Sequence, residues 1–298
     1  MSPRVLGALA AASLGWGFAA IGVRTAFEAG VTTFTIIGVR LGVAALAVVV
    51  FSLVRSRRLT RELWLHGAFI GIPRIGLAPV LFIASLRYIS AGVEAIIITT
   101  IPVVTALMAW LFLKEEQSRA QQAGFAVALA GSLVIIVSGE SGLAAGEGNP
   151  LLGGLLALGG VFFASLSGVV ARYYAPRHDT ASLAVPMFIT GGAFAFAAAF
   201  VLRDFHPGEL DLPLWVLLVA LGLGSTLLPF AATLYAAKHT TAARTALVAY
   251  VAPLITVIGG VLILDEVLTA PILIGGSLAL TGVVLAGSST RFPRRVGA

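Results

Sequence analysis

The chain has 298 residues, of which 59% are hydrophobic and only 11% are charged, and its mean hydropathy is +1.03. A soluble globular protein usually carries about 25% charged residues, so this composition excludes a water-soluble globule and indicates a bilayer protein. The absence of cysteine excludes disulfides and thiolate metal sites. The net charge of +6 comes from short basic clusters between apolar runs, which are typical of membrane-topology signals rather than of nucleic-acid binding.

Ten segments are apolar enough to cross a membrane as helices, each of which needs about 20 apolar residues. In chain order they are 5–25, 33–54, 64–86, 92–113, 121–138, 151–172, 181–202, 213–236, 244–264 and 271–288. The first segment lacks a strongly basic start and leads directly into the second, so it is not expected to be a cleavable signal peptide. The predicted fold is an all-α integral membrane protein.

The basic residues predict the orientation of these spans. If the N-terminus is cytoplasmic, most of the 19 Lys and Arg residues fall in cytoplasmic segments, including the cluster at 55–61 and the tail at 291–295. Most acidic residues then fall on the outer side. Because cytoplasmic loops carry an excess of Lys and Arg, both termini are predicted to be cytoplasmic, in the inner membrane.

One sequence unit occurs twice, at an offset of 151 residues. Its four positions, with a further threonine, are Pro102, Thr105, Glu115, Gly124 and Gly131 in the first copy and Pro253, Thr256, Glu266, Gly275 and Gly282 in the second. This indicates an internal duplication. It predicts an N-terminal five-helix repeat at 1–139 and a C-terminal five-helix repeat at 150–298 that ends in a short basic tail, with a linker at 140–150.

Five is an odd number of crossings, so the second copy must enter the membrane from the opposite side. The sequence therefore predicts ten transmembrane helices arranged as two inverted five-helix repeats, an architecture of many secondary transporters whose substrate sites lie near the bilayer midplane.

Together, these features resemble the EamA-type transporters of the drug/metabolite transporter superfamily. The resemblance rests on the ten spans, the repeated unit, Gly15-Trp16-Gly17 in the first span and Arg40-Leu41 in the second, and it covers nearly the whole chain. It implies a carrier of the cytoplasmic membrane that exports amino acids or other metabolites by alternating access without ATP. The start of the second repeat departs from the pattern, because an offset of 146 there would set Phe162 opposite Trp16.

Arg74 and Trp16 are the leading candidates for substrate binding. A charge at the bilayer centre costs roughly 3 kcal/mol and faces the bundle interior, and Arg74 lies about eleven residues into the third span, directly after Pro73. Trp16 lies at a similar depth in the first span. A guanidinium offers a planar fork to a carboxylate or phosphate, and an indole offers an apolar face with one donor. The pair is predicted to hold an organic anion or the carboxylate of a zwitterion.

Further candidates each carry a structural alternative. Arg40 either lines the cavity or satisfies carbonyls of a neighbouring helix, and Trp16 itself either contacts substrate or packs in the core. Thr99, Thr100 and Tyr250 precede the matched prolines and either line a shared cavity or, for the threonines, bond back to their own helix.

Acidic residues and helix breakers complete the candidates. Glu94 is a solvated cap, an arginine partner or a proton-coupling carboxylate, whereas the acidic pairs at 115–116 and 265–266 are expected to end one helix and open the next. Pro102 and Pro253 are predicted hinges, since a proline frees a carbonyl at membrane depth. Two small-xxx-small pairs, Gly38 with Gly42 and Gly67 with Gly71, are expected to meet other helices.

The sequence therefore predicts a secondary transporter of small molecules in the lipid bilayer, with the proton as candidate coupling ion and without cofactor, metal or nucleic-acid partner. A channel and a proton-coupled multidrug exporter are the alternatives. An enzyme is not expected, because the four histidines are scattered and HExxH, GxSxG and P-loop motifs are absent. The sequence specifies neither the substrate nor the oligomeric state.

Overall fold

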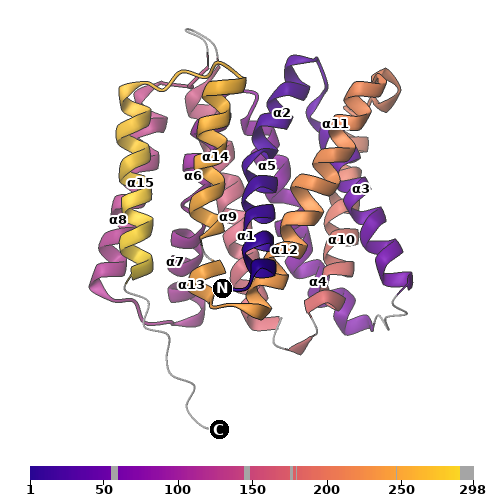
Figure 1. Cartoon of the computed structure of the whole chain (residues 1–298), viewed down its shortest axis with the longest axis horizontal. Coiled ribbons are helices and arrows are strands. Elements are labelled where there is room, and N and C mark those ends of the chain that lie inside the picture. The colour runs from indigo at the N-terminus through magenta and orange to yellow at the C-terminus, as the bar shows by residue number, and fades with distance from the viewer. Residues whose placement is uncertain (55–59, 144–147, 175–176, 179, 246, 289–298) are drawn as a thin grey trace.

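A computed structural model of the chain describes residues 1–54, 60–143, 148–174, 177–178, 180–245 and 247–288. Over these ranges the chain forms helices and no strands. Figure 1 shows the helices packed as one bundle along a common direction. Most of the predicted basic cluster, at 55–58, part of the predicted linker, at 144–147, and the basic tail lie outside the described residues.

In the first half, three of the five membrane-crossing segments are built from consecutive helices. The elements are α1 (Pro3–Gly17) with α2 (Ala19–Glu28), α3 (Thr33–Val54), α4 (Arg61–Gly71) with the π-helix η1 (Ile72–Leu77) and α5 (Ala78–Ser85), α6 (Ala91–Ile98) with α7 (Ile101–Leu113), and α8 (Arg119–Ser138).

The second half repeats this order with a different pattern of interruptions. Its elements are α9 (Pro150–Tyr174), α10 (Thr180–Val201), the 3-10 turn η3 (Pro207–Glu209), α11 (Leu212–Gly222) with the π-helix η4 (Leu223–Leu227) and α12 (Leu228–His239), α13 (Ala242–Thr245), α14 (Val248–Ile263) and α15 (Ala270–Ser288).

Nine helical segments within the described residues are long and apolar enough to span a membrane, and α14 is a shorter apolar helix of 16 residues. The predicted ninth span, 244–264, was therefore wrong in its extent, because α13 ends at Thr245 and α14 begins only at Val248. At about 1.5 Å per residue α14 is about 24 Å long, which is less than the roughly 30 Å hydrocarbon core. The architecture is that of a multi-pass membrane protein, with the N-terminus and the end of α15 on the same side of the bundle (Figure 1).

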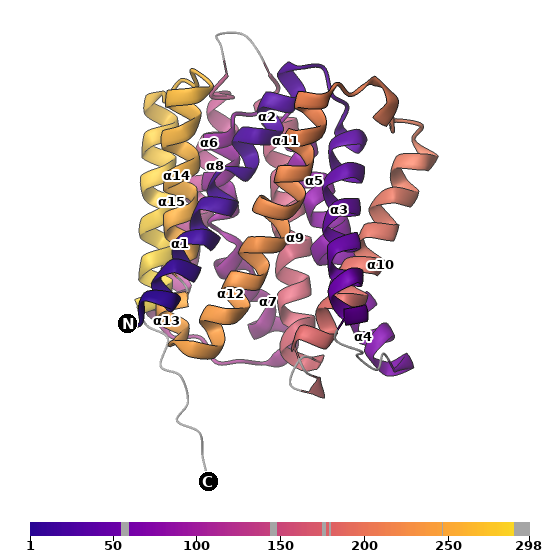
Figure 2. The same ribbon diagram turned by 45° about the vertical axis from the view of Figure 1, so that its right-hand side comes forward.

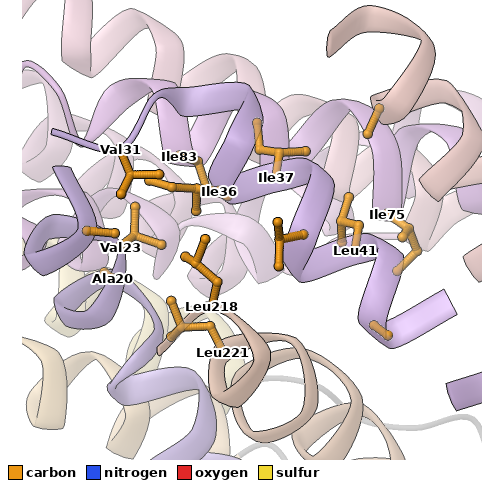
Figure 3. Packing of buried hydrophobic residues seen from close by; sticks show 14 of the residues in the cluster. Ala20, Val23, Val31, Ile36, Ile37, Leu41, Ile75, Ile83, Leu218 and Leu221 are labelled. Carbon is orange, nitrogen blue, oxygen red and sulfur yellow. The ribbon is translucent and has the colours of Figure 1, made fainter. Parts of the chain in front are cut away.

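A large buried cluster joins the two halves of the chain. Val23 on α2, Ile36 and Ile37 on α3 and Ile83 on α5 pack with Leu218 on α11, as Figure 3 shows. The side chains of Val23, Ile36, Ile37 and Leu218 are fully buried. Helices from both halves therefore share one core.

The helices α8 and α15 lie side by side in both views (Figures 1 and 2) and approach through glycine. Gly124 faces Gly282, and Gly131 faces Gly275; a Cβ atom added to any of the four would collide with the opposite backbone. Because the residue number falls along α15 as it rises along α8, the two helices run antiparallel. Small residues permit this close approach, which lets helices pack in lipid without a hydrophobic driving force.

The predicted small-residue faces agree with the structure at three of four positions. Gly67 lies against Pro186 of α10, Gly71 lies against the backbone of Met187, and Gly38 lies against the ring of Phe205. The expectation for Gly42 was wrong, since no described atom comes within 4 Å of a Cβ built there. The spacing of two glycines indicates a small face but does not say which turn a neighbour touches.

Candidate substrate site and the contact that closes one end

Two spans contain a π-helical segment, and these segments begin at residues 72 and 223, again 151 residues apart. A π-helix bonds each N–H to the carbonyl five residues back, so the turn is wider and its polar groups have poorer partners within the helix. Such turns are frequent at functional sites. The predicted Arg74 lies on the first, η1.

The guanidinium of Arg74 has no partner in the described part of the chain. Its side chain is half-buried, and no hydrogen bond or ion pair from a described residue reaches it. A guanidinium carries five N–H donors and no acceptor. The middle of the third span therefore presents a cation whose donors are available to a ligand.

Arg40 on α3, by contrast, is engaged with the second π-helix. Its Nε donates to Oγ1 of Thr226 at 2.7 Å, and its Nη2 donates to the carbonyl oxygen of Ser225 at 3.1 Å. The Thr226 hydroxyl donates onward to the carbonyl of Leu221 at 3.2 Å. These bonds correspond to the structural alternative for Arg40, in which the guanidinium satisfies polar groups of an irregular turn.

Trp16 is half-buried on α1 and packs against a small cluster that includes Leu9, Ala12 and Ala232. The glycines on either side explain the close packing of this turn, since Gly15 faces the carbonyl of Gly224 and Gly17 faces that of Ala252. Within the described residues no hydrogen bond or ring contact joins Trp16 to Arg74. The described contacts therefore do not join the two candidates into one site.

Thr99 and Thr100 occupy the break between α6 and α7. Both are buried, and their hydroxyls donate to the carbonyls of Ile96 and Ile97, each at 2.6 Å. Such back-bonding leaves these hydroxyls able to accept, but not to donate, a further hydrogen bond. Pro102 follows as the second residue of α7, where a missing N–H costs little.

The second copy of the repeat differs at the matching positions. Pro253 is buried inside the continuous helix α14 rather than after a break. Tyr250 packs against a cluster that contains Val103, Phe125 and Val283, and its hydroxyl lies beside Gly287 of α15. The described residues show no contact between Tyr250 and Thr99 or Thr100.

Glu94 is buried on α6, with only 3% of its surface exposed. Its charge interacts with that of Arg40 and with that of Glu266, but no described residue forms a hydrogen bond with its side chain. Glu94 is therefore not a solvated cap. An arginine and a second carboxylate are thus both near enough to influence its charge.

Glu266 binds the N-terminus of α6 across the bundle. Its Oε1 accepts from the N–H of Ala91 at 2.6 Å and its Oε2 accepts from the N–H of Gly92 at 2.9 Å. The first N–H groups of a helix lack partners within the helix, and the helix dipole also favours a negative charge there. Burial raises the pKa of Glu266, and the two backbone N–H donors oppose that rise.

Sequence reasoning missed this role, because it assigned the acidic pair to the ends of its own neighbouring helices. The doubled unit does indicate that Glu266 is special, but no local pattern identifies a helix start 175 residues away as its partner.

The segment between the halves also takes part in this contact. The N–H of Ser90 donates to the carbonyl of Ser141 at 2.8 Å, and the N–H of Val267 donates to that of Gly142 at 3.0 Å. Arg24 adds a bond from Nη1 to the carbonyl of Leu86 at 3.0 Å. This end of the bundle is therefore held by hydrogen bonds that join both halves and the segment between them.

The matching carboxylate at the other end has a weaker partner. Nη1 of Arg172 donates to the two oxygens of Glu115 at 2.8 and 3.1 Å, and both side chains are almost half exposed. Exposed ion pairs contribute little, typically below about 1 kcal/mol. The end of the bundle that holds Glu266 is thus joined by the more buried polar contacts.

Two apolar grooves lie on the outside of the bundle. One, of about 600 Å³, is lined by α8 and α15 residues such as Leu133 and Ile274, and the other, of about 550 Å³, is lined mainly by α3 residues such as Leu46 and Phe51. Neither groove is lined by a candidate site residue. Their apolar, exposed side chains are those expected where helices face lipid.

Comparison with known proteins decides the family. The model of the EamA-like transporter family matches residues 4–137 and again residues 151–288. The chain belongs to the EamA-like transporter family. This EamA-like protein is accordingly a membrane transporter and not an enzyme, as the sequence predicted.

Similar proteins agree with this assignment. The chain is 24% identical to the uncharacterized transporter YvbV of Bacillus subtilis over 85% of this chain and 82% of that protein, and 26% identical to the uncharacterized transporter YdfC of the same organism over 90% and 86%. It is 29% identical to a probable terminal-alkyne amino-acid exporter of Streptantibioticus cattleyicolor over 70% and 68%. A solved crystal structure with 19% identity matches with a TM-score of 0.66 over 99% of both chains, which shows a shared fold.

The two matched carboxylates give a direct test of the closed end. In Glu266→Ala the N–H groups of Ala91 and Gly92 lose charged acceptors, each worth about 2 kcal/mol, so peptides covering the start of α6 should exchange hydrogen up to about 30-fold faster. Glu115→Ala, which removes only an exposed pair, should leave that exchange unchanged. Hydrogen–deuterium exchange of the two variants measures this, and equal exchange in Glu266→Ala and the unmodified protein would contradict the assigned role.

Proposed function

We propose that this EamA-like transporter exports small organic anions or zwitterions, such as amino acids, across the cytoplasmic membrane, with Arg74 binding the anionic group. The observation that carries the proposal is the half-buried guanidinium of Arg74, which has no partner among the described residues and lies on a π-helical turn in a membrane span. The relative in Streptantibioticus cattleyicolor, a probable terminal-alkyne amino-acid exporter, supports the substrate class.

The mechanism we propose is alternating access between two inverted halves, residues 1–139 and 150–298. The antiparallel contact of α8 with α15 supports it. Gly124 meets Gly282, which is the repeat counterpart of Gly131, and Gly131 meets Gly275, which is the repeat counterpart of Gly124. A two-fold axis in the membrane plane would generate this pairing. The family model also matches the two halves separately.

A second contact pair supports the same offset near the start of each half. Thr256 donates to the carbonyl of Gly17 at 2.7 Å, and Thr105 lies against Gly168. Thr256 and Thr105 are 151 residues apart, and so are Gly168 and Gly17. This favours Ser167, rather than Phe162, as the counterpart of Trp16. The offset of 146 in the sequence rests only on the match of Leu6-Gly7 with Leu152-Gly153.

In this mechanism the buried bonds of Glu266 hold the outer end shut while the cytoplasmic end, with its exposed pair of Glu115 and Arg172, opens. Release of the Ala91 and Gly92 N–H groups from Glu266 would accompany the opposite movement. Pro102, directly after the break between α6 and α7, supplies a hinge on the first side, and Pro253 supplies one on the second.

The inversion can be tested at matched positions. Glu116 and Val267 are 151 residues apart, both are exposed, and the chain has no cysteine to give background labelling. In intact cells a membrane-impermeant maleimide should label Val267→Cys directly, whereas Glu116→Cys should react only after the membrane is opened. Repeats of parallel topology would place both cysteines on the same side.

Arg74 can be tested by substitution. Arg74→Ala should lower the uptake of labelled amino acids into inside-out vesicles at least tenfold, since a bidentate charged contact is worth about 2 kcal/mol or more. Arg74→Lys should restore transport in part, because lysine keeps the charge and loses the planar fork.

Two further variants keep this test interpretable. Arg119→Ala removes an exposed charge at the start of α8 and should transport normally. Arg40→Ala leaves Thr226 and the Ser225 carbonyl without a donor, so its folded yield in detergent should fall together with transport. Normal transport by Arg74→Ala, or a loss that only follows its folded yield, would refute a binding role.

Glu94 favours proton coupling as a second feature of the same function. It is buried, its charge interacts with those of Arg40 and Glu266, and no described residue donates a hydrogen bond to it. Buried ionisable residues of this kind often form proton relays in transporters. In vesicles with an imposed pH gradient, Glu94→Gln should remove the gradient's acceleration of transport, and the exposed-site control Glu116→Gln should retain it. A Glu94→Gln protein that still responds fully to the gradient would exclude this role.

A further inference from the structure

A cluster of metal-ligand side chains lies away from the candidate substrate site. Glu62 and His66 stand one turn apart on α4, and His178 follows the end of α9. One ligand atom from each of the three lies within 4.8 Å of those from the other two. Figure 1 shows the start of α4 and the end of α9 on the side of the bundle that holds the N-terminus. Two of the chain's four histidines thus meet at one end of the transporter, although 112 residues separate them.

The geometry of the cluster suits a transition-metal cation. Nδ1 of His66 is 2.7 Å from Nε2 of His178 and 3.8 Å from Oε1 of Glu62. A tetrahedral Zn²⁺ with bonds of about 2.0–2.1 Å separates its ligand atoms by roughly 3.3 Å, which lies between these two distances. A cation would therefore replace the bond between the two imidazoles once the three ligand atoms, which lie within 4.8 Å of one another, move to about this separation.

The ring of His66 is held in place by its surroundings. It stacks on Tyr174 with the ring centroids 4.0 Å apart, and Tyr174 itself belongs to the end of α9. The nearby cation Arg177 lies over the rings of Tyr173 and Tyr174, at 4.7 and 5.8 Å from their centroids. The histidine ring is thus positioned before any ion arrives, which lowers the cost of binding.

We propose that Glu62, His66 and His178 bind one transition-metal cation of the Zn²⁺ type. Two imidazoles and one carboxylate favour Zn²⁺, Co²⁺, Ni²⁺ or Cu²⁺, whereas Ca²⁺ and Mg²⁺ prefer sites made of oxygen alone. Three protein ligands leave a fourth position for water. Because the site joins α4 of the first half to His178 of the second, a bound cation crosslinks the halves at this end and restrains their relative movement.

The binding test uses the full-length chain with an affinity tag that contains no histidine, titrated with Zn²⁺ by calorimetry. We expect one Zn²⁺ per chain, with affinity reduced at least tenfold in His66→Ala and in His178→Ala, because loss of a direct ligand should cost at least as much as loss of an outer-shell partner. His239→Ala is the matched control: His239 ends α12, and its Nδ1 lies 2.8 Å from the carbonyl of Tyr235.

Co²⁺ supplies a second readout, since its visible absorption reports imidazole coordination and should disappear in the two ligand variants but not in His239→Ala. Size-exclusion elution identifies any variant that fails to fold. If His66→Ala fails to fold, His178→Ala still tests the site, because His178 lies outside the helices. Absence of Zn²⁺ binding to the unmodified chain, or equal binding by all folded variants, would overturn the proposal. Neither result depends on the transported substrate.

Discussion

In a bilayer, each backbone carbonyl that a helix leaves unpaired must find a donor within the protein, because lipid offers none. The interrupted spans of this transporter meet that requirement with side chains from elsewhere in the bundle. Arg40 donates to Ser225 in η4, Thr256 donates to Gly17 at the end of α1, and Ser167 donates to Ile70 just before η1. The irregular turns are possible only where these helices already touch, so the packing of the halves and the shape of the central spans are determined together.

Close packing through glycine also holds helices together at the edge of the bundle. The contact of α8 with α15 holds two backbones together through glycine and joins the first half to the second. The helices that contain breaks or π-helical turns lie elsewhere, among them α1, α6 and η1. The bundle thus combines a glycine-packed pair of helices with irregular spans whose backbone is bonded by polar side chains.

Much of the fold followed from apolar run length, since nine of the ten predicted spans correspond to long helices. The ninth did not, because α14 begins only at Val248, later than the apolar run that hydropathy detects. Site residues were harder to predict. Sequence depth ranked Arg74 above Arg40, but only three-dimensional contacts show that Arg74 lacks a described partner and that Arg40 is bonded to η4. The roles of Glu266 and of the His66–His178 pair depend on contacts across more than a hundred residues, which periodicity cannot reveal.

The two halves differ in charge at positions that are 151 residues apart. Where the first half carries Arg40 and Arg74, the second carries Gly191 and Ser225. Arg40 is bonded to Thr226 and Ser225 of η4, so Arg74 is left as the interior guanidinium without a partner among the described residues. A full elementary charge that crosses the membrane exchanges about 2.3 kcal/mol per 100 mV with the transmembrane field. If Arg74 moves even part of that way, voltage itself becomes a force on the empty carrier, and an anion bound to Arg74 switches that force off.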